Sequence, residues 1–124
     1  KKEDNIDLVI HNFVLLIDGK ILPSNYVYHQ GIMHNLIMSS YIGCMMAFRK
    51  TLLGDNFTFP QGLMAHDQWI GLLGEKKRSS YYCNEILVKY RRHFKVQTKK
   101  MNLRNKILFR IKMFCLYENN LRKV

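Results

Sequence analysis

The segment Asp7–Ile17 constrains the fold of this chain more than any other part of the sequence. It reads DLVIHNFVLLI, and this density of β-branched and aromatic residues is typical of a β-strand. The dipeptide Asp18-Gly19 follows directly and favours the tight turn of a β-hairpin, after which Lys20-Ile21-Leu22 resumes the apolar pattern. We therefore expect a long strand, a two-residue turn and a short second strand.

Two further segments predict strands. Residues 41–48 (YIGCMMAF) form an apolar run that Gly43 interrupts, which is typical of a buried strand where another group approaches closely. Residues 79–90 alternate well enough for one or two strands, with a break near Asn84. Together with the helices below, these strands predict an α/β fold.

Three segments have helical spacing. Residues 26–40 predict a loop with a short helix, and residues 65–75 predict a longer helix in which Trp69 lies on the apolar side. From Met101 onward, apolar residues recur every three or four positions with basic residues largely between them, which predicts a basic amphipathic helix. The apolar stripe of that helix consists of Leu103, Ile107, Ile111 and Phe114.

Basic residues are concentrated in the second half of the chain. The 124 residues include 20 Lys and Arg against 9 Asp and Glu, a formal net charge of +11. Basic and acidic residues balance up to residue 62, so the whole excess lies in residues 63–124. The length fits one domain, and the charge predicts an anionic partner that contacts the second half.

Other features exclude several classes of protein. The three cysteines, Cys44, Cys83 and Cys115, are too dispersed for a disulfide framework or a zinc site, which favours a reducing, cytoplasmic location. The apolar stretches fall short of the roughly 18 residues that a membrane span requires. The chain starts KKEDN, with neither Met nor a signal-peptide pattern, so we expect it to be part of a longer product.

Three short motifs follow one another along the chain. An apolar segment around Gly43 ends in basic residues (IGCMMAFRK), HDQW stands at the start of a predicted helix, and a strand pattern ends in YRRH. In order and separation, over most of residues 7–93, these motifs resemble the C-terminal half of a family 2 glycosyltransferase of the GT-A fold. The resemblance implies a partial GT-A domain over residues 1–98, with a mixed sheet and flanking helices and without the N-terminal nucleotide-binding half.

The resemblance also implies roles for individual residues. Asp67 of HDQW matches the carboxylate that acts as base toward the acceptor hydroxyl in inverting members. His93 of YRRH matches the histidine that helps bind a divalent metal, Mn²⁺ or Mg²⁺, on the nucleotide diphosphate, and Gly43 matches a glycine near the donor sugar. The other candidates for donor or acceptor binding are His66, Trp69, Arg91 and Arg92. The implied activity is inverting, metal-dependent transfer of a sugar from a nucleotide sugar to a polysaccharide or lipid-linked acceptor, and the isolated chain is expected to be inactive.

Each residue that is given a chemical role here also has a purely structural explanation. Sugar transfer needs a base for the hydroxyl proton, and partial burial of Asp67 under Trp69 would raise the carboxyl pKa toward that task. Arg91 and Arg92 can donate charge-assisted hydrogen bonds to phosphate. Without these motifs, Asp67 would be read as a favourable first-turn helix residue, Trp69 as a core residue and His93 as a surface residue.

Residues 99–124 are expected to form a basic helical tail with two alternative roles. Its cations suit peripheral contact with the anionic inner face of the cell membrane, whereas its apolar stripe also suits packing on the domain. Nucleic-acid binding ranks second among the functions, because the charge suits phosphate backbones while no nucleic-acid-binding motif supports it. A non-catalytic interaction module is the third.

Overall fold

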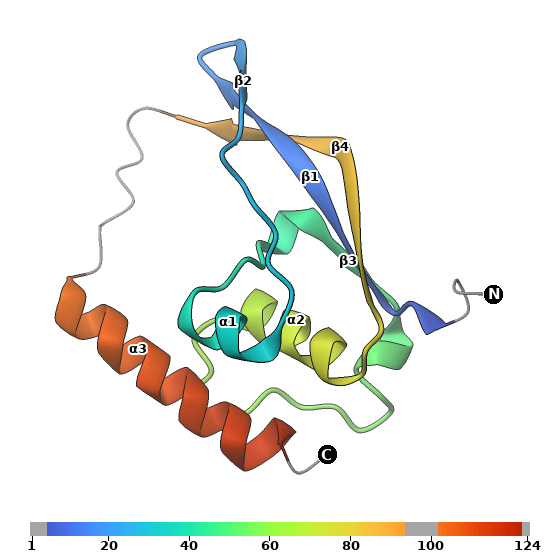
Figure 1. Cartoon of the computed structure of the whole chain (residues 1–124), viewed down its shortest axis with the longest axis vertical. Coiled ribbons are helices and arrows are strands. Elements are labelled where there is room, and N and C mark those ends of the chain that lie inside the picture. Colours follow the sequence, from blue (N-terminus) through green and yellow to red (C-terminus); the bar gives the residue numbers. More distant parts are fainter. Residues whose placement is uncertain (1–4, 94–101, 123–124) are drawn as a thin grey trace.

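The computed structural model describes residues 5–93 and 102–122, and these residues form a mixed α/β fold (Figure 1). The expected α/β class is therefore confirmed, whereas the assignment to a partial GT-A fold stays a prediction. The expected boundary between residues 98 and 99 lies outside the described residues. The helices are α1 (Ile32–Ile37), α2 (His66–Lys76) and α3 (Leu103–Leu116).

The sheet is built around one long central strand, β1 (Leu8–Ile17). Along one edge, β4 (Ser80–Arg92) runs parallel to β1 over its whole length. Along the other edge, β3 (Met46–Phe48) pairs antiparallel with the start of β1, and β2 (Lys20–Pro23) pairs antiparallel with its end. The sheet is therefore mixed, and its end at β2 extends beyond the helices (Figure 1).

The predicted hairpin and the predicted break in β4 are both confirmed. Asp18 and Gly19 have positive φ angles of 49° and 77°, as expected for the type I′ turn that matches the twist of a hairpin. In β4, the pairing with β1 shifts between Cys83 and Ile86, so Asn84 and Glu85 form a bulge in one continuous strand.

The predicted strand over residues 41–48 is wrong in its first part. Only Met46–Phe48 pairs with β1, whereas Gly43–Met45 forms a 3₁₀ turn. The reason lies in Tyr41, whose ring packs so closely on α2 that a Cβ atom at Gly71 would lie 2.2 Å from it. Because this contact fixes the chain on the helix, the segment has to turn at Gly43 before it reaches the sheet.

One hydrophobic core holds the layers together. Trp69 and Leu72 of α2 are fully buried between Leu8 and Ile10 of β1 on one side and Met113 of α3 on the other. Burying large apolar side chains from three elements in this way supplies the main driving force for the fold.

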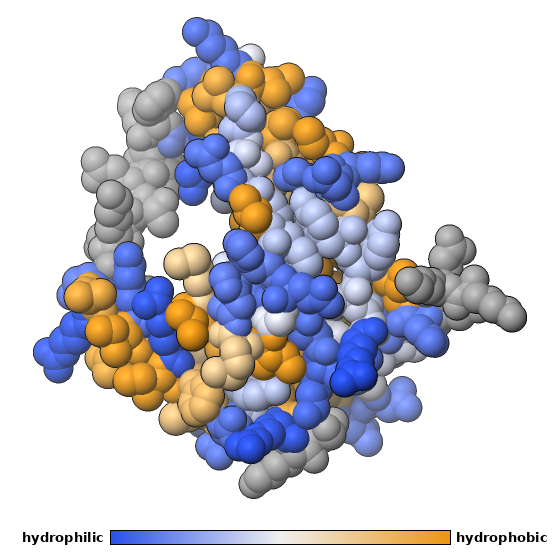
Figure 2. All heavy atoms as spheres, viewed as in Figure 1, coloured by the Kyte–Doolittle hydropathy of each residue, from blue (hydrophilic) through white to orange (hydrophobic). Residues whose placement is uncertain are grey.

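The helix predicted after Met101 is confirmed, but the side that packs on the domain is not the predicted stripe. Asn102 caps α3, because its side-chain oxygen accepts a hydrogen bond from the Asn105 backbone amide at 2.8 Å. The core contacts come from Met113 and from Tyr117 and Leu121 in the following π-helical turn. The predicted stripe is exposed, and hydrophobic residues run along α3 with hydrophilic residues beside them at the lower left of Figure 2.

Candidate functional site at the start of α2

Asp67 and Gly43, which lie in different motifs, lie close together in the structure. A Cβ atom at Gly43 would lie 3.7 Å from the Asp67 Cβ atom and 4.0 Å from Asp67 Oδ2. Asp67 Oδ1 accepts a hydrogen bond from the Gln68 backbone amide at 2.8 Å, which fixes the carboxylate at the start of α2. Because Gly43 has no side chain, the Oδ2 side of the half-buried carboxylate faces an uncrowded turn.

The negative charge of Asp67 affects the thiol of Cys44, which follows Gly43 in the turn. Loss of hydration raises the pKa of the Cys44 thiol, and the negative charge of Asp67 raises it further. The carboxylate therefore contributes to the electrostatic environment of Cys44.

A cavity of about 440 Å³ lies on the sheet side of this turn. Ile42 and Met45 line the cavity from the turn, and Arg92 lines it from the end of β4. Tyr26 lines it as well, and burial, with a smaller contribution from Tyr82, raises the pKa of Tyr26 to about 12, so this hydroxyl keeps its proton at neutral pH. The volume is in the range of cavities that bind small molecules.

Arg91 and Arg92 differ in their position relative to this cavity. Successive side chains of a strand point to opposite faces of the sheet, so Arg91 points away from the cavity that Arg92 lines. Arg92 also lies over the ring of Tyr90, with 5.9 Å between the guanidinium carbon and the ring centroid. Of the two predicted phosphate-binding arginines, only Arg92 is placed on the cavity.

The remaining predicted residues lie in three different environments. His66 is exposed at the start of α2, with its ring edge-on to Phe59 at a centroid distance of 4.6 Å. Trp69 is 1% exposed in the core, which leaves its ring almost no surface for an acceptor. His93 is exposed directly after β4.

The expected divalent metal has no complete ligand set in the described part of the chain. Across residues 5–93 and 102–122, no three His, Cys, Asp or Glu side chains are grouped as metal ligands. His93 supplies one imidazole, which is too few donors to hold Mn²⁺ or Mg²⁺. These residues do not fit a metal site by themselves, and the metal stays a prediction of the resemblance.

Asn35 is a positioning residue that the sequence analysis missed. Its side chain is fully buried, and its amide nitrogen donates hydrogen bonds to the backbone oxygens of His29 and Gly31. Its amide oxygen accepts from both the backbone amide and the hydroxyl of Ser40. Gln68, adjacent to Asp67, donates to the Asn35 backbone oxygen at 2.7 Å. Asn35 therefore ties the loop before the Gly43 turn to the start of α2.

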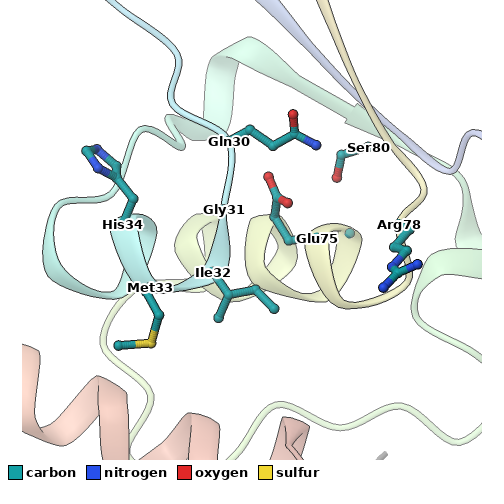
Figure 3. A pocket seen from close by; sticks show the side chains of 9 residues that line it. Gln30, Gly31, Ile32, Met33, His34, Glu75, Arg78 and Ser80 are labelled. Carbon is teal, nitrogen blue, oxygen red and sulfur yellow. The ribbon is translucent and has the colours of Figure 1, made fainter.

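A second pocket, of about 800 Å³, lies at the opposite end of α2 (Figure 3). In Figure 3, the side chains of Gln30, Glu75 and Ser80 point toward the same opening. Glu75 Oε1 accepts hydrogen bonds from the hydroxyls of Tyr28 at 2.9 Å and Tyr41 at 3.1 Å. Burial and the neighbouring Glu75 raise the pKa of both tyrosines well above the usual value. Glu75 thereby links two loop segments to α2, which is a structural role.

Comparison with known proteins identifies no family for this chain. No family model, curated protein or solved structure matches the chain. Within the described residues, no helix combines the length and apolarity needed to cross a membrane.

Proposed function

We propose that this chain supplies the acceptor side of a glycosyltransferase that transfers a sugar from a nucleotide sugar to a saccharide or lipid-linked acceptor. The observation that carries the proposal is the proximity of Gly43 to Asp67, since a Cβ atom at Gly43 would lie 3.7 Å from the Asp67 Cβ atom. The two residues belong to separate motifs and lie close together, and Ile42 and Met45 on either side of Gly43 and Cys44 line a cavity that Arg92 lines from β4.

In the proposed reaction, Asp67 is the general base. Its Oδ1 is held by the Gln68 amide, so Oδ2 accepts the proton of the acceptor hydroxyl. The acceptor oxygen then forms a bond to the anomeric carbon, and the bond from that carbon to the diphosphate oxygen breaks with inversion. Arg92 donates hydrogen bonds to the departing diphosphate, which carries the negative charge away. The missing side chain at Gly43 keeps the Oδ2 side of the base uncrowded.

The test is sugar transfer by the polypeptide that contains this chain, with Asp67→Asn compared with Asp55→Asn. Asp55 is exposed in a loop, so the two variants lose the same charge. We expect Asp67→Asn to lower the transfer rate by about 100-fold or more, as is typical for loss of a general base. Asp55→Asn should keep the wild-type rate, and both variants should keep the wild-type melting temperature. Wild-type transfer by Asp67→Asn would overturn the proposed role of the carboxylate.

A further inference from the structure

Helix α3 has two apolar sides, of which the domain covers one. Met113 is fully buried, and Phe109 and Leu116 pack against the same core. The second side consists of residues that the domain leaves uncovered, with exposed fractions of 71% at Leu103 and 55% at Ile111. The exposed apolar stripe of α3 is made of Leu103, Ile107, Ile111 and Phe114, with Leu108 beside it.

Cations border this stripe on both sides. At about 100° per residue, Lys106 and Arg110 lie along one side of the stripe and Arg104 and Lys112 along the other. The only acidic residue between Asn102 and Arg122 is Glu118, and it is paired with Arg122 at 2.6 Å. The outer surface of α3 therefore combines an aliphatic centre with an unopposed positive rim.

Beyond Lys106 and Arg110, further exposed apolar side chains lie at the end of α1. Ile37 and Met38 are 58% and 62% exposed. They line a cavity of about 290 Å³ together with Phe109 and the cations Lys106 and Arg110. This surface is thus wider than one helix and keeps the same combination of apolar and basic side chains.

We propose that the exposed apolar stripe of α3 docks on an anionic lipid bilayer, with the helix lying parallel to the membrane plane. Aliphatic side chains would enter the acyl boundary while the flanking cations contact lipid phosphates, which is the arrangement of interfacial amphipathic helices. The fourteen residues of α3 are too few to span a bilayer, for which about 20 are required.

Charge complementarity favours a lipid surface over two other occupants. A second copy of the chain packed symmetrically on this stripe would bring like-charged rims together, which opposes association. A nucleic acid would satisfy the cations but would leave the aliphatic centre without an apolar partner. A bilayer with anionic headgroups satisfies both parts of the surface. This inference does not depend on the proposed sugar transfer.

The test is sedimentation of the full chain with vesicles of phosphatidylcholine, with and without phosphatidylglycerol. We expect binding to the vesicles that contain phosphatidylglycerol, weakening as salt is raised. The double variant Ile107→Glu/Ile111→Glu should lower the partition coefficient by roughly 100-fold or more, because two apolar side chains leave the interface.

The matched control is Asn105→Glu/Asn119→Glu, which adds the same negative charge at exposed polar positions. This control should bind far better than the isoleucine variant, and both should melt like the wild type because all four side chains are exposed. Equal binding by the two double variants, or no binding of the wild type to anionic vesicles, would overturn the proposal. A lipid-free dimer that Ile107→Glu/Ile111→Glu makes monomeric would also overturn it, by identifying the stripe as a contact between copies.

Discussion

At Asp67, one carboxylate serves both the start of a helix and the turn around Gly43. Its Oδ1 is engaged by the Gln68 amide, and its Oδ2 lies against the position where Gly43 lacks a side chain. The same side chain can therefore stabilise the start of the helix and act as an accessible base. What distinguishes Asp67 from an ordinary first-turn aspartate is the open turn beside it.

The influence of Asp67 on Cys44 gives a test of this geometry that needs no substrate. Replacing Asp67 by Asn removes the charge that helps to raise the pKa of the Cys44 thiol. We therefore expect Asp67→Asn to lower this pKa slightly and to speed alkylation of Cys44 measurably near neutral pH, since the thiolate is the reactive form. The measurement is the iodoacetamide reaction rate in a Cys83→Ser/Cys115→Ser background. An unchanged rate, matching that of Asp55→Asn, would contradict the contact.

Removing the small side chain of Asn35 is expected to lower the stability of the fold substantially. Removing its buried amide leaves the backbone oxygens of His29 and Gly31 and the Ser40 groups without their partner. We expect Asn35→Ala to lower the free energy of unfolding by about 3 kcal/mol. Asn119→Ala, at an exposed position, should change it by less than about 0.5 kcal/mol in the same urea titration. Equal values for the two variants would contradict the role given to Asn35.

Among the elements, α2 is the one that organises the site. It carries Asp67 at its first turn and Trp69 and Leu72 in the core. Two of its glycines permit close approach of other segments, because a Cβ atom at Gly71 or Gly74 would collide with Tyr41 or Leu8. The position of the Gly43 turn thus depends on a residue one helix turn beyond Asp67.

This dependence predicts a large loss of stability for one glycine-to-alanine change and a small effect for another. In Gly71→Ala, the new methyl group would lie 2.2 Å from the Tyr41 ring, so we expect a loss of about 3 kcal/mol despite the higher helix propensity of alanine. In Gly43→Ala, the methyl group would make ordinary contacts with Asp67 at 3.7 Å, and stability should change by less than about 1 kcal/mol. Thermal or urea unfolding measures both values. A Gly71→Ala variant as stable as Gly43→Ala would refute the close packing of Tyr41 on α2.

Over the whole molecule, Tyr28 and Tyr41 join loop, sheet and helix through Glu75. The two hydroxyls share Glu75 Oε1, and the Tyr28 ring stacks on Tyr82 of β4 at a centroid distance of 4.9 Å. Both hydroxyls have to remain protonated to donate these bonds. The fold is therefore coupled to the titration of tyrosine.

This coupling predicts loss of stability in alkali. The folded-state pKa of Tyr41 is raised above the ordinary value of 10.0, so its contribution is complete below that pH and is lost as the pH rises above it. We expect the melting temperature to fall more steeply above about pH 10 for the wild type than for Tyr41→Phe. Tyr81→Phe, at a residue 52% exposed, should keep the wild-type slope. Parallel profiles for all three proteins would contradict the coupling.

Local patterns predicted much of the fold. The Asp18-Gly19 hairpin, helix α2 and the bulge at Asn84 follow from residues that are neighbours in sequence, and the structure has all three. The strand predicted at Gly43 failed because a distant residue, Gly71, determines where Tyr41 packs.

The candidate site was predictable only as a set of residue types. Motif order indicates Gly43 and Asp67, but neither their proximity nor the separation of Arg91 from the cavity has a local signal. The hydrogen-bond network around Asn35 depends on loop geometry. Which apolar side of α3 stays exposed depends on which side packs on the core. Such choices are made by tertiary packing, which a single periodic pattern does not specify.

The proposed sugar site is tested most directly by chemical-shift mapping of this chain, ¹⁵N-labelled within the polypeptide that contains it, during titration with UDP- and dTDP-sugars and with short saccharides. If the Gly43 turn and Asp67 form a sugar site, the largest changes will fall on the amides of Gly43, Cys44 and Gln68, and they will disappear in Asp67→Asn. If sugars leave these amides unchanged while a single-stranded oligonucleotide shifts the basic residues of β4 and α3, the glycosyltransferase account is contradicted and nucleic-acid binding takes its place.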